Sequence, residues 1–597
     1  MRLGPACARA LLLAAAVGLG LLPAAPRAAD PTRSASERLR RLTRVYLDGL
    51  FRAKPHLASA LGDARFDRLV QDLSAAAVAR RVRDLVAQQG ALGRVERDEL
   101  GPEERVDAAV LADGIALELL ELREIRPWTW NPRLEDPFVH YDPREVVGGR
   151  LADLVRGGAP EAERLAALTA QLRALPRYLA QRRAAFGAVS KVHLDAAVEE
   201  VAGLVGFFEG ELAAFTRKDP AAERARAAAL GALRGYSRLL ATELPRRATR
   251  DWRLGPALYR KKFPHALQTD TSPEETERRA LASLRAARAE LFQVARGLHA
   301  RFWPADALPP DDAPAEVQAR VVGRVKDEIA KVHAPPDGLV AATASKLDGL
   351  RAFIEREKLV ALPPADTLRV LPMPEFKRGG NGAEYLAPGL LAAGGGWKGT
   401  YYVEPPDPSW PPEKVEGYLR TWNDVEIELT AAHEAYPGHH TQAFWALRDR
   451  SPLRAALWSG TFAEGWAVYG TTLLVRRGYG AERNDVYRFA DLRGDLIVAA
   501  NAILDIRLQG GDLSDAEAVR FLIEESFQDP VQAERKLLRA KLDSTQLCQY
   551  FLGTEEIRAL EAEARAKGGF DQRAFDEALV GHGTVAVKHL RPFVLGR

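Results

Sequence analysis

The sequence is organised around one stretch, Ala431-Ala432-His433-Glu434-Ala435-Tyr436-Pro437-Gly438-His439-His440-Thr441-Gln442. Three of the 11 histidines of the chain lie in it, and a glutamate follows the first of them. A His-Glu pair with a second histidine shortly after it is the sequence pattern of a zinc hydrolase site. In the common form of that motif the two histidines are four residues apart on one helix, whereas His433 and His439 are six apart. Whether these two side chains can share a metal therefore depends on the residues between them.

The residues before His433 predict a buried helix. Asn423 followed by Glu426 has the form of a capping box. One apolar stripe follows at helical spacing, formed by Val425, Leu429, Ala432 and Tyr436. Pro437 and Gly438 come next, and proline removes a backbone hydrogen bond and clashes with the preceding turn. We therefore expect a kink or bulge at this pair.

Such a distortion decides which histidine can reach the metal. On an ideal helix, residues six apart differ by about 240° around the axis, so His433 and His439 would face different sides. A bulge that absorbs Pro437 and Gly438 would return His439 to the side of His433. His440 would face the right side of a straight helix, but about 10 Å further along it. We predict His433 and His439 as ligands, with His440 as the alternative.

Glu464 is the best candidate for a third ligand. It lies in Thr461-Phe462-Ala463-Glu464-Gly465-Trp466-Ala467, at the start of a second expected helix, 463–474. Thr461 and Glu464 also have the form of a capping box, so a structural cap is the alternative. Glu434 would project beside the metal, as the general base for the water that zinc activates by lowering its pKa to about 7. Two histidines, a glutamate and a nearby base favour zinc over other divalent metals.

The whole chain has the composition of a large soluble globular protein. It has 597 residues, 47% hydrophobic, with 84 basic and 81 acidic side chains. This near balance gives no sign of a nucleic-acid partner or of an anionic membrane surface. Amphipathic periodicity over 34–250, 272–357 and 413–597 predicts helices. No long polar linker divides the chain, so we expect a single domain over 30–597, with a helical lobe at 30–250 and a catalytic lobe at 251–597.

A short segment breaks the helical pattern. The β-prone runs 368–371 and 400–403 enclose a glycine-rich stretch, and together they predict a small β hairpin or sheet near residues 366–404. The fold class is therefore mostly α. In zinc peptidases a strand at the edge of the cleft can bind an extended peptide by main-chain pairing, and we take this as a hypothesis for the segment.

Residues 1–29 have the pattern of a signal peptide. Arg2 and Arg9 precede the apolar run 10–22, and an alanine-rich segment follows. The alternative is a membrane anchor, but the run is shorter than the roughly 20 residues that a spanning helix needs. Cys7 lies before the run, which argues against a lipid anchor, and Cys548 is the only other cysteine. We predict an exported bacterial protein, periplasmic or secreted, without stable membrane insertion after cleavage.

The two motifs resemble a large bacterial family known as domain of unknown function 885. Its pattern is His-Glu-x-x-Pro-Gly-His-x-x-Gln followed by Glu-Gly-Trp-Ala, which matches His433 to Gln442 and Glu464 to Ala467. The family in turn looks similar to the helical zinc peptidases of the oligopeptidase and carboxypeptidase types, which are built around a deep cleft. The resemblance favours His439 over His440 as a ligand, and a ligand role for Glu464 over a cap.

Near the C terminus the resemblance implies two further site residues. Arg539, Gln546, Tyr550 and Gly553 match a family pattern of Arg-Tyr, Pro-Gly-Gln and Tyr-x-x-Gly. Tyr550 is the candidate that stabilises the oxyanion, and Arg539 is the candidate for binding a substrate carboxylate. The alternative for both is ordinary helix packing.

Several outer positions depart from the family pattern. Thr471 stands where many members have Glu, Gln509 where they have His, and Asp576 replaces a histidine near the C terminus. These changes suggest an altered substrate choice or a lost activity. The predicted function is a zinc metallopeptidase that cleaves short peptide substrates. The alternatives are a non-catalytic metal-binding protein of the cell envelope on the same scaffold, and a hydrolase of non-peptide amides.

Overall fold

The computed structural model describes residues 34–136, 144–157, 159–374, 378, 382–392, 398–449 and 451–596. The predicted signal peptide at 1–29 and part of the glycine-rich stretch, at 375–377, 379–381 and 393–397, lie outside the described residues. Helices account for 71% of the structure, and a small three-stranded sheet accompanies them. The prediction of a mostly α fold with a small sheet near 366–404 is confirmed.

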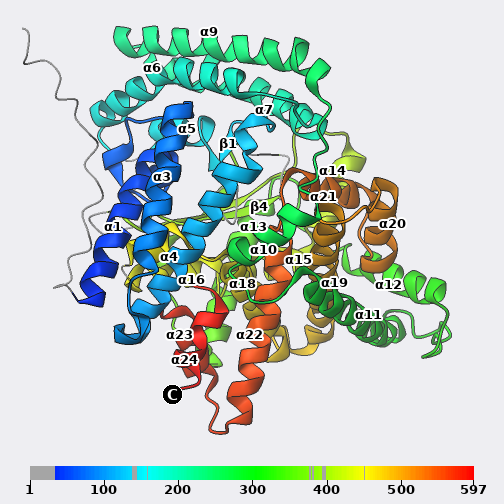
Figure 1. Ribbon diagram of the computed structural model, residues 1–597. Helices are drawn as coiled ribbons and strands as arrows, with labels where there is room; N and C mark the ends of the chain where they lie inside the picture. Colours follow the sequence, from blue (N-terminus) through cyan, green and yellow to red (C-terminus); the bar gives the residue numbers. More distant parts are fainter. Residues whose placement is uncertain are drawn as a thin grey trace, which may run out of the picture.

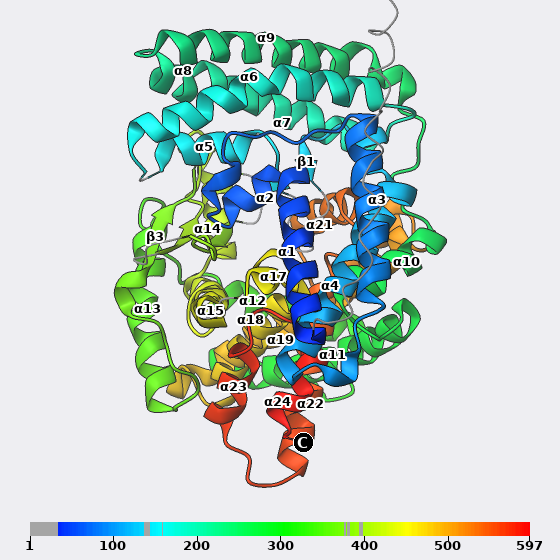
Figure 2. The ribbon, with the colours of Figure 1, turned by 60° about the vertical axis from the view of Figure 1, so that its left-hand side comes forward.

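The first helices of the chain belong to the main body. They are α1 (Ala35–Ala53), α2 (Pro55–Ala60), α3 (Ala75–Leu92) and α4 (Pro102–Leu120). Ser34 caps α1 in a full capping box with Glu37. Apolar side chains of α1, such as Tyr46 and Leu50, are completely buried and join the same core as the C-terminal helices. These four helices therefore cover one side of the body (Figure 2).

The next five helices lie together at one end of the molecule, where α6, α7 and α9 are at the top of Figure 1 and all five are labelled in Figure 2. They are α5 (Gly148–Arg156), α6 (Glu161–Ala185), α7 (Lys191–Glu209), α8 (Glu211–Thr216) and α9 (Pro220–Thr242). Their Ala and Leu stripes, including Leu172 and Leu233, form a second buried cluster that is separate from the main core. The division of the chain into lobes at residue 250 stays a prediction.

The main body is built from the remaining helices. They are α10 (Pro256–Leu267), α11 (Pro273–Phe302), α12 (Ala315–Ile329), α13 (Leu339–Arg356), α14 (Pro412–Thr421), α15 (Asp424–Glu434), α16 (His439–Asp449), α17 (Pro452–Ala456), α18 (Gly460–Arg476), α19 (Asn484–Gln509), α20 (Asp515–Ser526), α21 (Pro530–Leu542), α22 (Cys548–Ala566), α23 (Gln572–Val580) and α24 (Val587–Val594). The long helices pack in pairs, α11 against α19 and α18 against α22. The second pair carries much of the candidate site.

A mixed sheet lies beside these helices. β5 (Gly399–Val403) is its central strand, with β3 (Leu368–Pro372) parallel on one side and β4 (Ala383–Leu386) antiparallel on the other. Only β5 is largely buried. A separate two-stranded ladder joins β1 (Glu135–Asp136) to β2 (Arg144–Glu145). Among the described helices, none is both long enough and apolar enough to cross a bilayer.

Candidate metal centre

The Pro437-Gly438 pair separates two helices. α15 ends at Glu434, and α16 begins at His439. We expected a kink or bulge within one helix, and this detail is wrong, because one helix ends before the pair and a new helix starts after it. The Gly438 amide donates to the carbonyl of Ala432 at 3.0 Å, so the chain folds back on the last turn of α15. A Cβ atom on Gly438 would lie only 1.8 Å from the carbonyl oxygen of His433, so this close return requires glycine.

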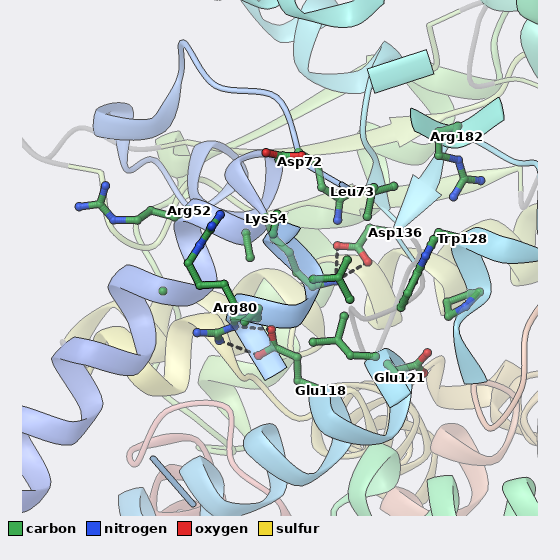
Figure 3. Close-up of a pocket in the computed structure, with 18 of the residues that line it drawn as sticks. Arg52, Lys54, Asp72, Leu73, Arg80, Glu118, Glu121, Trp128, Asp136 and Arg182 are labelled. Carbon is green, nitrogen blue, oxygen red and sulfur yellow. Dashed lines mark hydrogen bonds and ion pairs between the residues drawn. The ribbon is translucent and has the colours of Figure 1, made fainter. Parts of the chain in front are cut away.

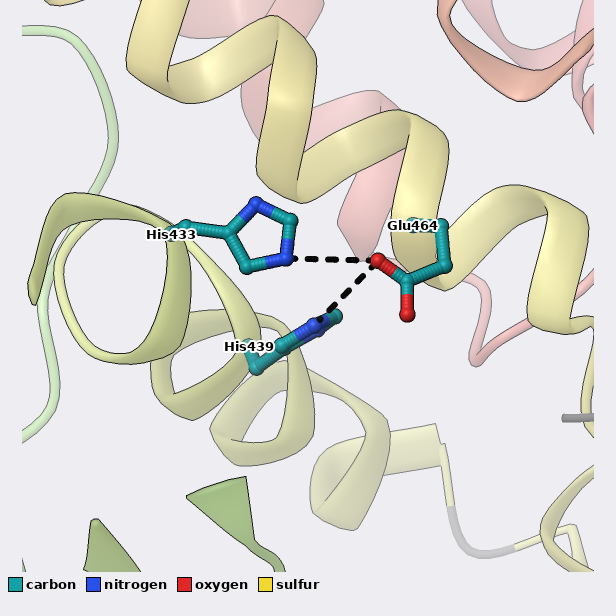
Figure 4. Close-up of side chains that lie close together, drawn as sticks. All are labelled: His433, His439 and Glu464. Carbon is teal, nitrogen blue, oxygen red and sulfur yellow. Dashed lines mark ion pairs between the residues drawn. The ribbon is translucent and has the colours of Figure 1, made fainter. Parts of the chain in front are cut away.

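This return brings His439 to His433, and α18 supplies Glu464 (Figure 4). The Nε2 atoms of His433 and His439 lie 3.2 and 3.6 Å from Oε2 of Glu464. The two rings are 4.8 Å apart and nearly perpendicular. One ligand atom from each residue lies within 4.8 Å of the other two. The structure thus brings together the three predicted ligands; we use the name metal cluster for these three side chains, and metal binding by them stays a prediction.

The surroundings of Glu464 fit a cation. Its side chain is 1% exposed, and neither of its oxygens has a conventional hydrogen bond to a described residue. Burial would raise the pKa of this carboxyl, but His439 and His433 hold it well below its usual range. A buried carboxylate with two imidazole nitrogens around it is a donor set that zinc accepts. The residues therefore fit a zinc ion, with His433 partly open to solvent.

Two alternatives from the sequence are not supported by this geometry. Ser459 caps α18, by accepting the amide of Phe462, so Glu464 lies inside the helix and does not form a capping box with Thr461. His440 is fully buried, and both of its ring nitrogens are engaged, Nδ1 with the Tyr385 hydroxyl at 3.0 Å and Nε2 with the Thr367 hydroxyl at 3.1 Å. His440 is therefore a structural residue next to the cluster.

Glu434 lies beside the metal cluster, and only part of its side chain is exposed. Its Oε2 accepts a hydrogen bond from the Tyr385 amide at 3.0 Å. Burial raises the pKa of Glu434 to about 7, and the charges of Glu464 and Glu384 act in the same direction against the opposing effect of His433. A carboxyl with a pKa near neutrality can both accept and return a proton, as a general base must.

The strand that contacts Glu434 was missed in the sequence. The expected strands were 368–371 and 400–403, and β4 between them was not predicted. The Glu404 amide donates to the Gly382 carbonyl. In this antiparallel register the even-numbered residues of β4 direct their backbone N–H and C=O groups toward β5, and the odd-numbered residues direct theirs away from it. Tyr385 then presents its amide at the free edge of the sheet, where it meets Glu434. Four residues among glycines carry too little alternation to predict a strand.

Tyr550 lies on α22, the helix that packs against α18 and therefore against the helix that carries Glu464. Its hydroxyl accepts hydrogen bonds from Arg539 at 3.1 Å and from Gln546 at 3.4 Å. Burial raises the pKa of Tyr550 to about 12, and the negative charge of Glu464 contributes. The phenol therefore keeps its proton and can donate a hydrogen bond. The structure places Arg539 next to Tyr550, and the roles of both residues stay predictions.

Two other motif residues hold the helix break in place. The indole of Trp466 donates to the carbonyl of Pro437 at 2.9 Å, and the amide of Gln442 donates to the hydroxyl of Thr584. Asp505 acts further away: it accepts the amides of Thr545 and Leu547, both at 3.0 Å, and so fixes the turn before α22. None of these three residues was assigned a role from the sequence.

The changed outer positions have structural partners in this chain. Thr471 bonds back to the carbonyl of Ala467 within α18. Gln509 donates to the carbonyls of Ala540 and Asp543. Asp576 is buried and accepts a bond from Gln572 at 3.1 Å. These side chains are integrated into helix packing, and none of them belongs to the metal cluster.

Comparisons with known proteins agree on fold and family. Residues 55–594 match the family described as "Bacterial protein of unknown function (DUF885)". One similar solved structure is described as a "putative lipoprotein of unknown function" from Shewanella oneidensis; it has a TM-score of 0.78 and 23% identity, and the match covers 93% of this chain and 99% of that one. Another is described as a "putative lipoprotein" from Colwellia psychrerythraea, with a TM-score of 0.73, 16% identity and coverage of 93% and 98%. No curated protein matches the chain.

Proposed function

The chain belongs to the bacterial family DUF885, and from the geometry of its metal cluster we propose that it is a zinc-dependent metallopeptidase that cleaves amide bonds of short peptides. The observation that carries this proposal is the buried carboxylate of Glu464, which has two imidazoles and no conventional hydrogen bond around it. A zinc ion held by His433, His439 and Glu464 would polarise a carbonyl and lower the pKa of a bound water to about 7.

The other residues of the site have roles that follow from their positions. Glu434 accepts a proton from the attacking water and delivers it to the leaving amine, which its pKa of about 7 favours. Tyr550 keeps its proton and donates a hydrogen bond to the oxygen on which negative charge develops. Arg539 supports Tyr550 and carries the positive charge for a substrate carboxylate.

The free edge of β4 supports a peptide as the substrate. An extended peptide can add to the edge of a sheet through main-chain hydrogen bonds. The Tyr385 amide lies at this edge and its nitrogen is 3.0 Å from Oε2 of Glu434. The proposed base therefore lies directly beside the edge of the strand. A peptide aligned along β4 would therefore pass close to the metal cluster.

Export is part of the proposal. The basic and apolar segments within 1–29 have the pattern of a signal peptide. Two solved structures of similar fold are each described as a "putative lipoprotein", which suits a protein of the cell envelope. Cys7 precedes the apolar run in this chain, so we propose release into the periplasm or the medium without a lipid anchor.

One experiment tests the function. The purified mature protein is analysed for bound metal and is then incubated with a library of short peptides, with and without a zinc chelator. Stoichiometric zinc and cleavage that the chelator stops are the expected results. Bound zinc without chelator-sensitive cleavage would favour a non-catalytic envelope protein instead. Cleavage of simple amides alone would favour an amidase.

A further inference from the structure

A cavity of about 230 Å³ lies in the N-terminal helices. Its walls come from α1, the segment 71–73, α3, the end of α4 with the turn after it, the segment from Pro127 to β1, and Arg182 of α6 (Figure 3). The metal cluster and Glu434 do not line it. The cavity is therefore a second hollow, to which the proposed peptidase function assigns no role.

Two ion pairs form opposite walls of this cavity. Lys54 binds Asp136, with its ammonium 2.6 Å from Oδ2, and Arg81 binds Glu118 through two bonds of 2.7 Å. Figure 3 shows the first pair on one side of the hollow and Glu118 on the other. These four charges compensate one another, so they stabilise the walls and leave the affinity for a ligand to other groups.

Among the buried charged side chains that line the cavity in the described part of the chain, Glu121 is the one with neither an ion pair nor a hydrogen bond. It is 5% exposed. Burial raises the pKa of its carboxyl to about 7, although Lys262 and Lys54 lie near enough to oppose this. Both lysines are occupied, Lys54 by Asp136 and Lys262 by Ser544 at 2.9 Å. Leaving a buried carboxyl unpaired costs free energy that a bound cation would recover.

The remaining lining residues indicate the shape of that cation. Trp128 and Glu121 lie on the same side of the hollow (Figure 3), and Leu73 and Leu122 add apolar surface. An aromatic face next to a carboxylate is a common environment for an ammonium group with an aliphatic body. Arg52 and Arg80 also line the cavity; both are exposed, and neither has an ion pair with another described residue. A ligand with a carboxylate at its far end would meet these two guanidinium groups.

We propose that this cavity binds a small zwitterion in which a short aliphatic chain separates an ammonium group from a carboxylate. The ammonium pairs with Glu121, the chain lies along Trp128, and the carboxylate faces Arg52 and Arg80 at the mouth. The class includes ω-amino acids of four to six carbons. The site stands whether or not the metal cluster catalyses hydrolysis, because the two share no residue.

Isothermal titration of the full mature protein with 5-aminopentanoate tests the proposal. We expect saturable binding to one site, at least tenfold weaker in Glu121→Gln because a charge-assisted bond is lost. Glu124→Gln, on the same turn but exposed and paired with Lys261, is the matched control and should bind as the parent does. Thermal unfolding of each variant confirms that it is folded.

Two further probes separate the parts of the proposal. Pentanoate, which lacks the ammonium group, should not bind measurably. Cadaverine, which replaces the carboxylate with a second ammonium, should bind at least tenfold more weakly than 5-aminopentanoate because it meets Arg52 and Arg80. Absence of 5-aminopentanoate binding, equal binding by Glu121→Gln, or equal binding of pentanoate or cadaverine would each overturn the proposal.

Discussion

A Cβ atom placed on Gly465 of α18 would lie 2.3 Å from the carbonyl carbon of Gly553 on α22. The two helices thus touch backbone to backbone, and any side chain at either position would push them apart. Glu464 precedes one of these glycines, and Tyr550 lies one turn before the other. The glycine contact is therefore what brings the proposed third ligand and the proposed oxyanion donor into one site.

We predict that Gly553→Ala disrupts both stability and the site. The added methyl would lie 1.8 Å from the carbonyl oxygen of Thr461, and such overpacking costs about 1–3 kcal/mol. Urea unfolding should show this loss, and zinc titration should show weaker binding. Gly297→Ala in α11 is the control: its Cβ has open space, so helix propensity should leave stability unchanged or raise it by about 0.5–1 kcal/mol. Parent-like stability and zinc affinity in Gly553→Ala would contradict this account of the helix contact.

Glu434→Gln should separate metal binding from catalysis. The substitution keeps the size of the side chain and can still accept the Tyr385 amide, but it cannot take a proton from water. We expect full zinc content and a fall in kcat of about 10²–10⁴-fold, the usual contribution of a general base. Elemental analysis and initial rates on the same preparation measure both quantities. A variant with parent-like kcat would exclude Glu434 as the base.

Tyr550→Phe should lower kcat by about 10²–10³-fold and leave KM nearly unchanged, because an oxyanion donor acts mainly in the transition state. Zinc content should not change, since the hydroxyl is bonded to Arg539 and Gln546 and is not part of the metal cluster. Tyr236→Phe removes a buried hydroxyl bond to Pro132 in the N-terminal layer and is the matched control for stability. If both variants lost kcat equally, the role of Tyr550 would be structural.

The sequence predicted the metal cluster better than the backbone around it. His433, His439 and Glu464 could be named because ligand types and motif order are visible in the residues themselves. The separation of α15 from α16 could not be, since it depends on the contact of Gly438 with His433 and on the bond from Trp466 to Pro437. The first is a local backbone contact and the second a tertiary one, and neither leaves a periodic pattern in the chain.

The helices could also be predicted from a pattern visible in the residues themselves, whereas β4 could not. Long amphipathic segments such as α11 repeat their pattern over many turns, whereas β4 has four residues and owes its conformation to pairing with β5. The N-terminal cavity was not predicted from the sequence. Glu121 resembles the many exposed glutamates of the N-terminal helices, and only the packing of α1, α3 and α4 shows that it is buried.

The pKa of Glu121 leads to a prediction for stability against pH. Burial raises this pKa from 4.5 to about 7, so the folded state favours the protonated form. The associated stabilisation is fully present below pH 4.5 and is lost as the pH rises through about 7. Glu121→Gln has no titrating carboxyl at this position, so its stability does not fall in this way as the pH rises. The difference in unfolding free energy between variant and parent should therefore grow by roughly 2–3 kcal/mol between pH 5 and 8. If the difference in unfolding free energy between variant and parent did not change with pH, Glu121 would not be the group whose titration lowers the stability.

Removing the metal should destabilise the parent protein through Glu464. A ligand that binds only the folded state adds about 2.7 kcal/mol when present at 100 times its Kd, so a chelator should lower the melting temperature. Glu464→Gln should bind no zinc and should melt at the same temperature with and without chelator. A neutral amide needs no cation beside it, so this variant should be at least as stable as the chelated parent. Glu413→Gln, exposed in the first turn of α14, should keep the full response to chelator. A chelator effect that persists in Glu464→Gln would show that the stabilising metal binds at another site.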